Sequence, residues 1–371
     1  MKDGNKASKI FIYIALCAVS IMIMTFFSYK SGYLNKISIV SKNSKSTKNI
    51  IKKGTVKKNM ETDVVLTSAG DCTIGTDPRL DESTSLITIV RNHNNDYSYL
   101  FKNAYNLFSK DDITTVNLES TFTNSNVKAN KTYAFKAPPE FAEALKDGSI
   151  EGVNLANNHT MDYYEKGFND TLEALKKYNI SYFGMDNKWI KDVKGVKIGF
   201  LGYEGFEYNN EVKNKIKSDI SELKNSGCAA VVINFHWGIE RSYYPNSVQK
   251  ALAHYAIDQG ADLIVGHHPH VIQGIEQYKG KIISYSLGNF CFGGNSNPTD
   301  KETFVLQTKF YFKNGALLKY NVRAVPFRIS SVNSSNDYCP TPLNGSDKEN
   351  VINKINNLSK GFGFNIKDSF D

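Results

Sequence analysis

Cysteine is scarce in this sequence, and its few copies are not paired. Five cysteines occur among 371 residues, at positions 17, 72, 228, 291 and 339, and no two of them form a Cys-x-x-Cys motif. A scaffold held together by disulfides needs many cysteines at short, regular spacings. We therefore do not expect disulfides to define the fold, which suits an exported protein that folds without them.

A basic excess is also lacking in most of the chain, although the formal net charge is +8. Residues 1–60 carry 12 basic side chains and a single acidic one, whereas the remaining 311 residues carry 33 basic and 36 acidic side chains, a net charge of −3. A nucleic-acid-binding domain needs its basic patch on the folded part, so we predict no nucleic-acid partner. The basic N-terminal part favours attraction to anionic lipid headgroups or wall polymers instead.

The N-terminal part has the features of a membrane anchor followed by a tether. Residues 10–29 contain no charged side chain and are long enough to cross a bilayer as a helix, and lysines precede them. Because no convincing cleavage site follows, we expect an uncleaved signal-anchor within residues 1–30 rather than a cleaved signal peptide. Residues 31–61 are rich in Lys, Ser and Asn, which is typical of a solvated tether. We predict a single-pass protein of the cell membrane with its larger part extracytoplasmic.

Strands and helices alternate in residues 62–330, which predicts one α/β domain. Residues 331–371 are expected to be a weakly structured tail with one helix near 347–358, and a hairpin is expected across residues 194–195. Apolar runs and periodicity predict strands at 64–67, 113–118, 150–155, 180–183, 196–201, 228–235, 261–265, 281–285, 303–312 and 317–325, and helices at 97–110, 164–178, 211–226 and 248–259.

Polar side chains follow five of the predicted strands, at the point where each strand ends. Because the carboxyl ends of parallel strands meet at one edge of a sheet, these side chains are expected to converge. A Gly-Asp turn or a histidine-rich surface turn is the simpler explanation for any one of them, but not for the recurrence. The side chains are Asp71, Glu119, Asn158, His236 and the pair His268 and His270.

Together these residues offer two carboxylates, one amide oxygen and three imidazoles. Such a mixed set of oxygen and nitrogen ligands suits Mn, Fe or Zn, and it is large enough for two ions that share one carboxylate. The sequence therefore predicts a site for one or two divalent metal ions.

Five further residues are candidates for chemistry or for contact with a substrate. His159 follows Asn158 and could act as a general acid. Asp162 could hold that imidazole in orientation or cap the following helix. Lys136 could contact an anion, or it could be an ordinary solvated lysine. We assign Asn157 and His267 to the substrate-binding set as well.

Several segments resemble the poly-γ-glutamate capsule synthesis family (CapA/PgsA type), which belongs to the calcineurin-like metallophosphatase superfamily. The resemblance covers about residues 62–328, and its motifs occur in the order of the family. The segments are GDCTIG, VNLEST, NLANNHTMDYYEKG, INFHWG, and GHHPHVIQGIE followed by YSLGNF.

The resemblance implies a four-layer α/β/β/α sandwich. It implies that His159 matches the catalytic histidine of the superfamily, and that His268 and His270, rather than His267, are the ligands within the histidine run. The implied metal ligands are Asp71, Glu119, Asn158, His236, His268 and His270. The sequence departs from the pattern at Thr73, where an Asp-x-His motif would have a histidine, and at Glu119, where a bridging aspartate is usual. These departures leave open whether the protein hydrolyses a substrate.

Three functions are compatible with these features. The resemblance implies a membrane-anchored component of poly-γ-glutamate synthesis or export, which would act on or near this anionic polymer and with other capsule synthase subunits. A surface metallophosphoesterase unrelated to polyglutamate is the second interpretation. A non-catalytic scaffold or polymer-binding protein of the same fold is the third.

Overall fold

The computed structural model describes residues 61–370. The predicted anchor in residues 1–30 lies outside this range, and so does the predicted tether except for Glu61, where the first strand begins. Within the described part of the chain, no helix combines the length and the apolar character that crossing a membrane requires.

The first of two large sheets has eight strands, with β1 at its centre. β1 pairs in parallel with β2 on one side and antiparallel with β14 on the other, in the order β16-β15-β14-β1-β2-β5-β6, and β13 pairs in parallel with the end of β1. The strands are β1 (Glu61–Thr73), β2 (Ile113–Leu118), β5 (Gly152–Asn154), β6 (Ser181–Phe183), β13 (Asn289–Phe292), β14 (Glu302–Lys313), β15 (Ala316–Arg328) and β16 (Thr341–Pro342).

The second large sheet has six strands in the order β11-β12-β10-β9-β8-β7. Its inner strands are parallel, and the predicted hairpin across residues 194–195 is present as the antiparallel pair β7 and β8. Its strands are β7 (Trp189–Val193), β8 (Val196–Glu204), β9 (Ala230–His236), β10 (Leu263–His267), β11 (Ile275–Tyr278) and β12 (Lys281–Ser284). A short parallel pair, β3 (Thr121–Phe122) and β4 (Lys136–Ala137), forms a separate small sheet.

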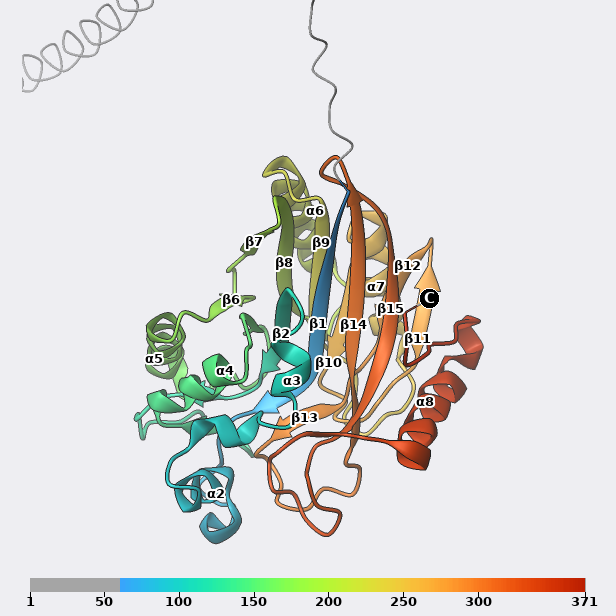
Figure 1. The fold of residues 1–371 in the computed structure, drawn as a ribbon. Coiled ribbons are helices and arrows are strands. Elements are labelled where there is room, and N and C mark those ends of the chain that lie inside the picture. Colours follow the sequence, from blue (N-terminus) through green and yellow to red (C-terminus); the bar gives the residue numbers. More distant parts are fainter. Residues whose placement is uncertain (1–60, 371) are drawn as a thin grey trace, which may run out of the picture. The chain divides into compact units, whose positions relative to one another are not determined.

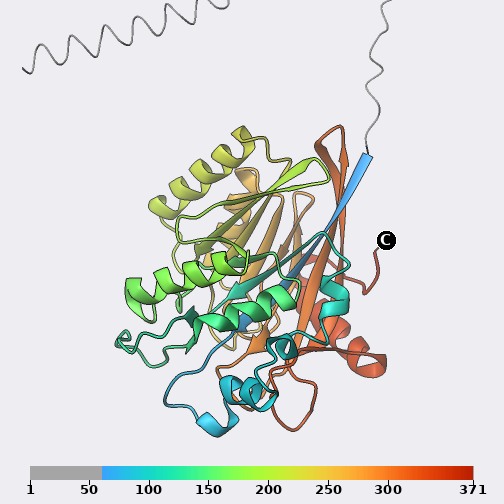
Figure 2. The ribbon, with the colours of Figure 1, turned by 60° about the vertical axis from the view of Figure 1, so that its left-hand side comes forward.

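Helices cover the outer faces of both sheets (Figures 1 and 2). The cover of the first sheet includes Leu175 of α5, and that of the second includes Leu252 of α7, each buried in its own hydrophobic cluster. The helices over the first sheet are η1 (Glu82–Thr84), α2 (Leu86–Asn92), η2 (Tyr97–Leu100), α3 (Tyr105–Phe108), η3 (Pro139–Ala142), α4 (Glu143–Asp147) and α5 (Tyr164–Lys177), and those over the second are α6 (Asn210–Asn225) and α7 (Ser247–Asp258).

A third hydrophobic cluster lies between the two sheets and joins them. Leu66 of β1 and Phe304 of β14 pack there with Phe200 of β8 and Val265 of β10. Burying such side chains stabilises the fold by about 1.5–3 kcal/mol each. The order is therefore helices, sheet, sheet, helices, which confirms the prediction of a mixed α/β domain.

One predicted helix is interrupted in the structure. Residues 97–110 form the short helices η2 and α3 with a turn between them. Tyr99, Leu100 and Phe101 are all buried. Three consecutive residues spread over about 200° of a regular helix, which is wider than the face that a helix on the surface of a sheet usually buries. The turn allows all three side chains to be buried.

The C-terminal residues are folded, and the expectation of a weakly structured tail is wrong for them. The predicted helix is present as α8 (Gly345–Ser359), followed by η4 (Lys360–Phe362). Val351 and Ile355, four residues apart on α8, join the cluster between the sheets. Tyr338 is buried and donates a hydrogen bond to the carbonyl of Thr84 at 2.6 Å. These apolar residues are buried only because distant strands provide the surface they cover.

Candidate metal centre

The ends of β1, β2, β5, β9 and β10 bring the predicted ligands together. Nitrogen and carboxylate oxygen atoms that could bind an ion lie within 4.8 Å of one another in three overlapping groups. The groups are Glu119, His236 and His268; Asp71, Glu119 and His270; and Glu240, His268 and His270. Five of the six predicted ligands therefore cluster by this criterion, and they are joined by Glu240, which was not among the predicted ligands.

An irregularity in β1 aims Asp71 at this cluster. The register with β2 shifts between Ser68 and Asp71, and Cys72 packs in the cluster under the outer helices instead of sharing the face of Leu66. A bulge of this kind turns the following side chains to the other face of a strand. The close approach of β1 to Gly288 at this point requires glycine at position 70, because a Cβ atom there would lie 2.0 Å from the carbonyl oxygen of Gly288.

Glu119 provides the main sign that a cation belongs here. Its side chain is 1% exposed, and neither of its oxygen atoms has a hydrogen-bond partner within residues 61–370. The nearest opposite groups are Nε2 of His236 at 3.4 Å and Nε2 of His270 at 3.8 Å. Burial raises the pKa of Glu119 well above its usual value. A buried carboxylate without donors is costly, and a divalent ion between these groups would satisfy it, so the residues fit a metal ion.

One ion position has four candidate ligands. Glu119, His236 and His268 form the first group, and Oδ1 of Asn158 lies 2.8 Å from Nε2 of His236. Ligand atoms about 2.0–2.2 Å from one ion are separated by about this distance at neighbouring corners of its coordination shell. Asn158 therefore lies next to His236, another of the predicted ligands.

The other ion position has three candidate ligands, Asp71, Glu119 and His270, and neighbouring residues hold Asp71 and His270 in place. Asp71 Oδ1 accepts a hydrogen bond from Asn117 at 2.8 Å, and Asp71 Oδ2 accepts one from the backbone N–H of His268 at 3.1 Å. His270 Nδ1 donates to Oδ1 of Asn289 at 2.8 Å, which leaves Nε2 to face Glu119. Such partners fix the tautomer and orientation of a metal-binding imidazole.

Burial and the charges within the cluster shift the pKa values of its histidines in opposite directions. Burial lowers the pKa of His268 to about 4, and it also lowers the pKa of His236 well below the usual value. For His270 burial acts in the same direction, but the carboxylates of Glu119 and Asp71 more than offset it and raise the pKa to about 10. Binding of a cation by Nε2 of His270 would therefore displace a proton.

A network of hydrogen bonds holds the imidazole of His159. Its Nδ1 donates to Oδ2 of Asp162 at 2.7 Å, and Oδ2 also accepts a hydrogen bond from the backbone N–H of Phe135 at 2.6 Å. Lys131 binds the other oxygen of Asp162 at 2.7 Å and the carbonyl of Asn158 at 2.6 Å. Burial lowers the pKa of His159, whereas Asp162 raises it. Of the two roles considered for Asp162, orientation of the imidazole is the one present, since α5 begins after Tyr163.

The other three residues predicted to contact a substrate are His267, Asn157 and Lys136, and each is bonded to protein groups. His267 is 1% exposed and donates from Nε2 to Asn234 at 2.9 Å, with Nδ1 3.6 Å from Asp71, so it lies behind that carboxylate. Asn157 is buried and accepts a hydrogen bond from the backbone N–H of His159, which shapes the turn between these two residues. Lys136 lines a separate pocket of about 440 Å³ and donates to the carbonyl of Ser125 at 2.5 Å.

Aromatic side chains surround the histidines. The ring of Phe206 is 40% exposed and lies edge-on to His268 with ring centres 5.0 Å apart. Phe292 lies 5.4 Å from His270, and Phe135 lies 4.7 Å from His159. Each of these three imidazoles therefore has an aromatic neighbour.

Sequence reasoning missed the residues that hold the ligands, although a signal was present. Asn117 and Asn234 are amides inside buried strands, and each precedes a site residue by two positions. An amide that is buried in a strand needs hydrogen-bond partners, which in this chain are site residues. Lys131 had no such signal, because it lies in a polar loop.

Comparisons with known proteins place the chain in a family. It is 34% identical over 268 residues to the capsule biosynthesis protein CapA of Bacillus anthracis, which covers 65% of this chain and 62% of that protein. It is 33% identical over 248 residues to the PGA biosynthesis protein CapA of Bacillus subtilis, which covers 61% of this chain and 64% of that protein. The chain thus matches less than two thirds of the length of either relative.

Among solved structures, a phosphatase from Mycoplasma pneumoniae is similar with a TM-score of 0.45 at 17% identity, over 72% of this chain and 95% of that one. A likeness this loose does not bear on activity. The family described as bacterial capsule synthesis protein PGA_cap matches residues 65–294, more than half of the sequence, and the chain therefore belongs to that family.

Proposed function

We propose that this protein takes part in the synthesis or export of a capsule polymer of the poly-γ-glutamate class, and that its metal centre hydrolyses a bond at a phosphorus or carbonyl centre. The names of the two Bacillus relatives support the first half of the proposal. The observation that carries the second half is the buried Glu119 carboxylate among His236, His268 and His270.

The fold is proposed to be a metallophosphatase-like α/β/β/α sandwich. Its support is the arrangement of two sheets between helices, with candidate ligands at the ends of strands from both sheets. Residues 10–29 are proposed to anchor the chain in the cell membrane with the folded part outside, on the basis of their length and lack of charge. Anionic polymer and other capsule synthase subunits are the partners that follow from this role.

Two sets of side chains would hold divalent metal ions, for which Mn, Fe or Zn is suited. Asp71, Glu119 and His270 form one set, and Glu119 with Asn158, His236 and His268 forms the other. When bound, such ions lower the pKa of a coordinated water and polarise the oxygen atoms of the substrate.

The protein's own groups would manage the proton of the leaving atom. Water adds its oxygen to the phosphorus or carbonyl carbon, and the bond to the leaving oxygen or nitrogen breaks. His159 gives its proton to that leaving atom and regains one from the water that was consumed. Asp162 keeps Nδ1 of His159 protonated, so Nε2 is the nitrogen that exchanges the proton, and Lys131 holds Asp162 in place.

The test is polymer production by cells that lack the chromosomal copy and carry the full-length protein or a His268→Ala/His270→Ala variant. His93→Ala, which changes an exposed histidine on the surface, is the control. The proposal predicts that the double variant fails to restore polymer although it accumulates like the control. Normal polymer in the double variant would refute the hydrolytic half and favour a scaffold. Unchanged polymer in cells lacking the protein altogether would refute the capsule role.

A further inference from the structure

Glu240 lies where it could reach the metal centre from the solvent side. It follows β9 on an exposed loop, and its carboxylate groups with nitrogen atoms of His268 and His270 within 4.8 Å. His268 is 7% exposed, and its Nδ1 has no hydrogen-bond partner in the described part of the chain. A buried imidazole nitrogen without a partner next to a free carboxylate is the arrangement that a bound cation would complete.

The loop that carries Glu240 is tied to the histidine loop. The backbone N–H of Arg241 donates to the carbonyl of Pro269 at 2.8 Å, between the two histidines in sequence. Gln273 donates from Nε2 to the carbonyl of Ser242, also at 2.8 Å. Glu240 is therefore an exposed carboxylate on a loop whose backbone is fixed by hydrogen bonds, which distinguishes it from an ordinary surface glutamate.

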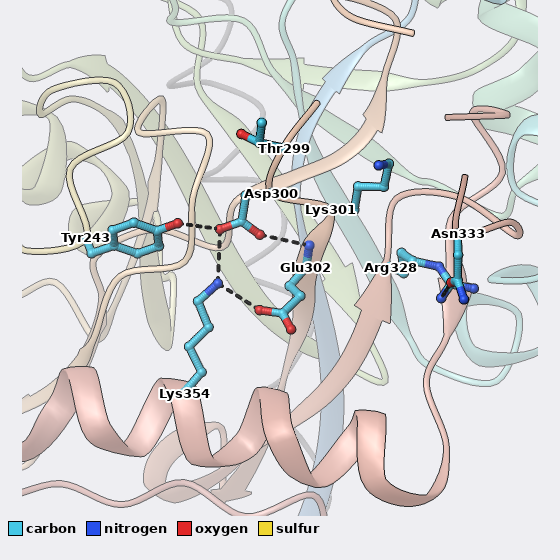
Figure 3. A pocket seen from close by; sticks show the side chains of 8 residues that line it. All are labelled: Tyr243, Thr299, Asp300, Lys301, Glu302, Arg328, Asn333 and Lys354. Atoms are coloured by element: carbon cyan, nitrogen blue, oxygen red, sulfur yellow. Dashed lines mark hydrogen bonds and ion pairs between the residues drawn. The ribbon is translucent and has the colours of Figure 1, made fainter. Parts of the chain in front are cut away.

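The C-terminal helix holds the far end of the same loop (Figure 3). Tyr243 donates to Oδ2 of Asp300 at 2.9 Å, and Lys354 of α8 donates to the same oxygen at 3.0 Å and to Glu302 at 2.7 Å. These side chains line a pocket of about 480 Å³. The contacts link the position of Glu240 to a segment more than a hundred residues away in sequence.

Both loops contain unusual backbone conformations at residues other than glycine. The φ angles are +95° at His268, +57° at His270 and +61° at Arg241. Non-glycine residues with positive φ are uncommon, and they persist where the surrounding contacts over-determine them, often at functional sites. Here they occur in the two loops whose side chains Glu240, His268 and His270 lie close together.

The count of ligands shows what Glu240 would add. One ion position has four protein ligands, whereas Asp71, Glu119 and His270 provide three for the other. Divalent transition metals in proteins commonly take four to six ligands. We propose that Glu240 is a further metal ligand on the solvent side of the centre, beside His268 and His270, and this inference rests on the metal-dependent function proposed above.

The experiment compares full-length protein, purified in detergent, with Glu240→Gln, Glu240→Asp and the control Glu349→Gln, which changes an exposed glutamate on α8. Affinities for Mn²⁺ and Zn²⁺ are measured by competition with a chelator, and the visible spectrum is recorded after loading with Co²⁺. We expect Glu240→Gln to lower the affinity for one of the two ions about tenfold or more and to change the Co²⁺ spectrum. Glu240→Asp should recover part of the affinity, and Glu349→Gln should match the parent.

Thermal unfolding of the ion-free proteins separates ligation from a structural role. A ligand role predicts equal unfolding temperatures of parent and Glu240→Gln without ions and a difference only after loading. Affinities within twofold of the parent and an unchanged Co²⁺ spectrum would overturn the inference while leaving the proposed function in place. A parent protein that binds no metal would overturn both.

Discussion

Replacing Asp162 by asparagine tests how the fold supports His159. The side chain of Asp162 is fully buried, and both of its oxygen atoms accept hydrogen bonds, from Lys131 on one side and from His159 and Phe135 on the other. An amide keeps the shape but offers one acceptor oxygen, so at least one donor must face an NH₂ group. Leaving a buried donor unpaired costs about 1–3 kcal/mol, and more when the donor is charged.

The expected loss for Asp162→Asn is therefore about 2–3 kcal/mol of unfolding free energy, or roughly 5 °C in Tm for a domain of this size. Because the Asp162 carboxylate raises the pKa of His159 against the effect of burial, the variant should also lower that pKa further. The protonated imidazole would then be lost at lower pH, and any reaction that uses it as an acid should show its alkaline limb shifted to lower pH.

Thermal unfolding followed by circular dichroism and titration of ¹³C-labelled histidines by NMR measure the two effects. Glu165→Gln, an exposed carboxylate on α5, is the control and should change stability by less than about 0.5 kcal/mol. The reasoning is refuted if Asp162→Asn is as stable as the control, or if the pKa of His159 rises or stays the same.

Three further predictions concern the metal centre, a half-buried acid and the C-terminal helix. Mass spectrometry of the loaded protein should find one or two metal ions per chain, and the His268→Ala/His270→Ala variant should have lost them; equal metal content would remove both histidines from the ligand set. Burial raises the pKa of Asp111 from 3.8 to about 7. As pH rises, the unfolded chain therefore releases this proton before the folded chain does. The free energy of unfolding falls by at most about 4 kcal/mol between about pH 4 and pH 7. Asp111→Asn should consequently unfold at a higher temperature than the parent at pH 8 but not at pH 4, and a stabilisation that is the same at both values would contradict the linkage. Ile355→Ala should cost about 2–5 kcal/mol in urea unfolding, since Ile355 of α8 is fully buried against the sheets, whereas a cost below about 1 kcal/mol would mean that α8 is dispensable.

Most of the strands and their polar ends could be predicted because the signals are local. An apolar run that stops at a carboxylate, amide or imidazole can be read from neighbouring residues, and β2, β9 and β14 follow their predicted ranges to within about two residues. The clustering of the strand-end residues follows from the general rule that parallel strands end at one edge.

Contacts between distant segments could not be predicted in this way. Lys131 and Lys136 are five positions apart, and no property of the sequence indicates that Lys131 reaches Asp162 while Lys136 turns to Ser125. Glu240 is one of many exposed acids, and it stands out only because Pro269 and Tyr243 hold its loop beside the histidines. The helix α8 was recognisable from its periodicity, but its burial depends on strands that precede it by many residues.

The sequence by itself determined the α/β class, the order of the elements and the residue types at the strand ends, because periodicity and strand termination are properties of neighbouring residues. Only the tertiary structure decided which of these side chains meet. A bulge in β1 turns Asp71 toward the other ligands, burial leaves both oxygen atoms of Glu119 without a hydrogen-bond partner within the described residues, and the loops that carry Glu240, His268 and His270 bring these side chains together. Each of these depends on backbone geometry and packing between segments far apart in the chain, which no local pattern encodes.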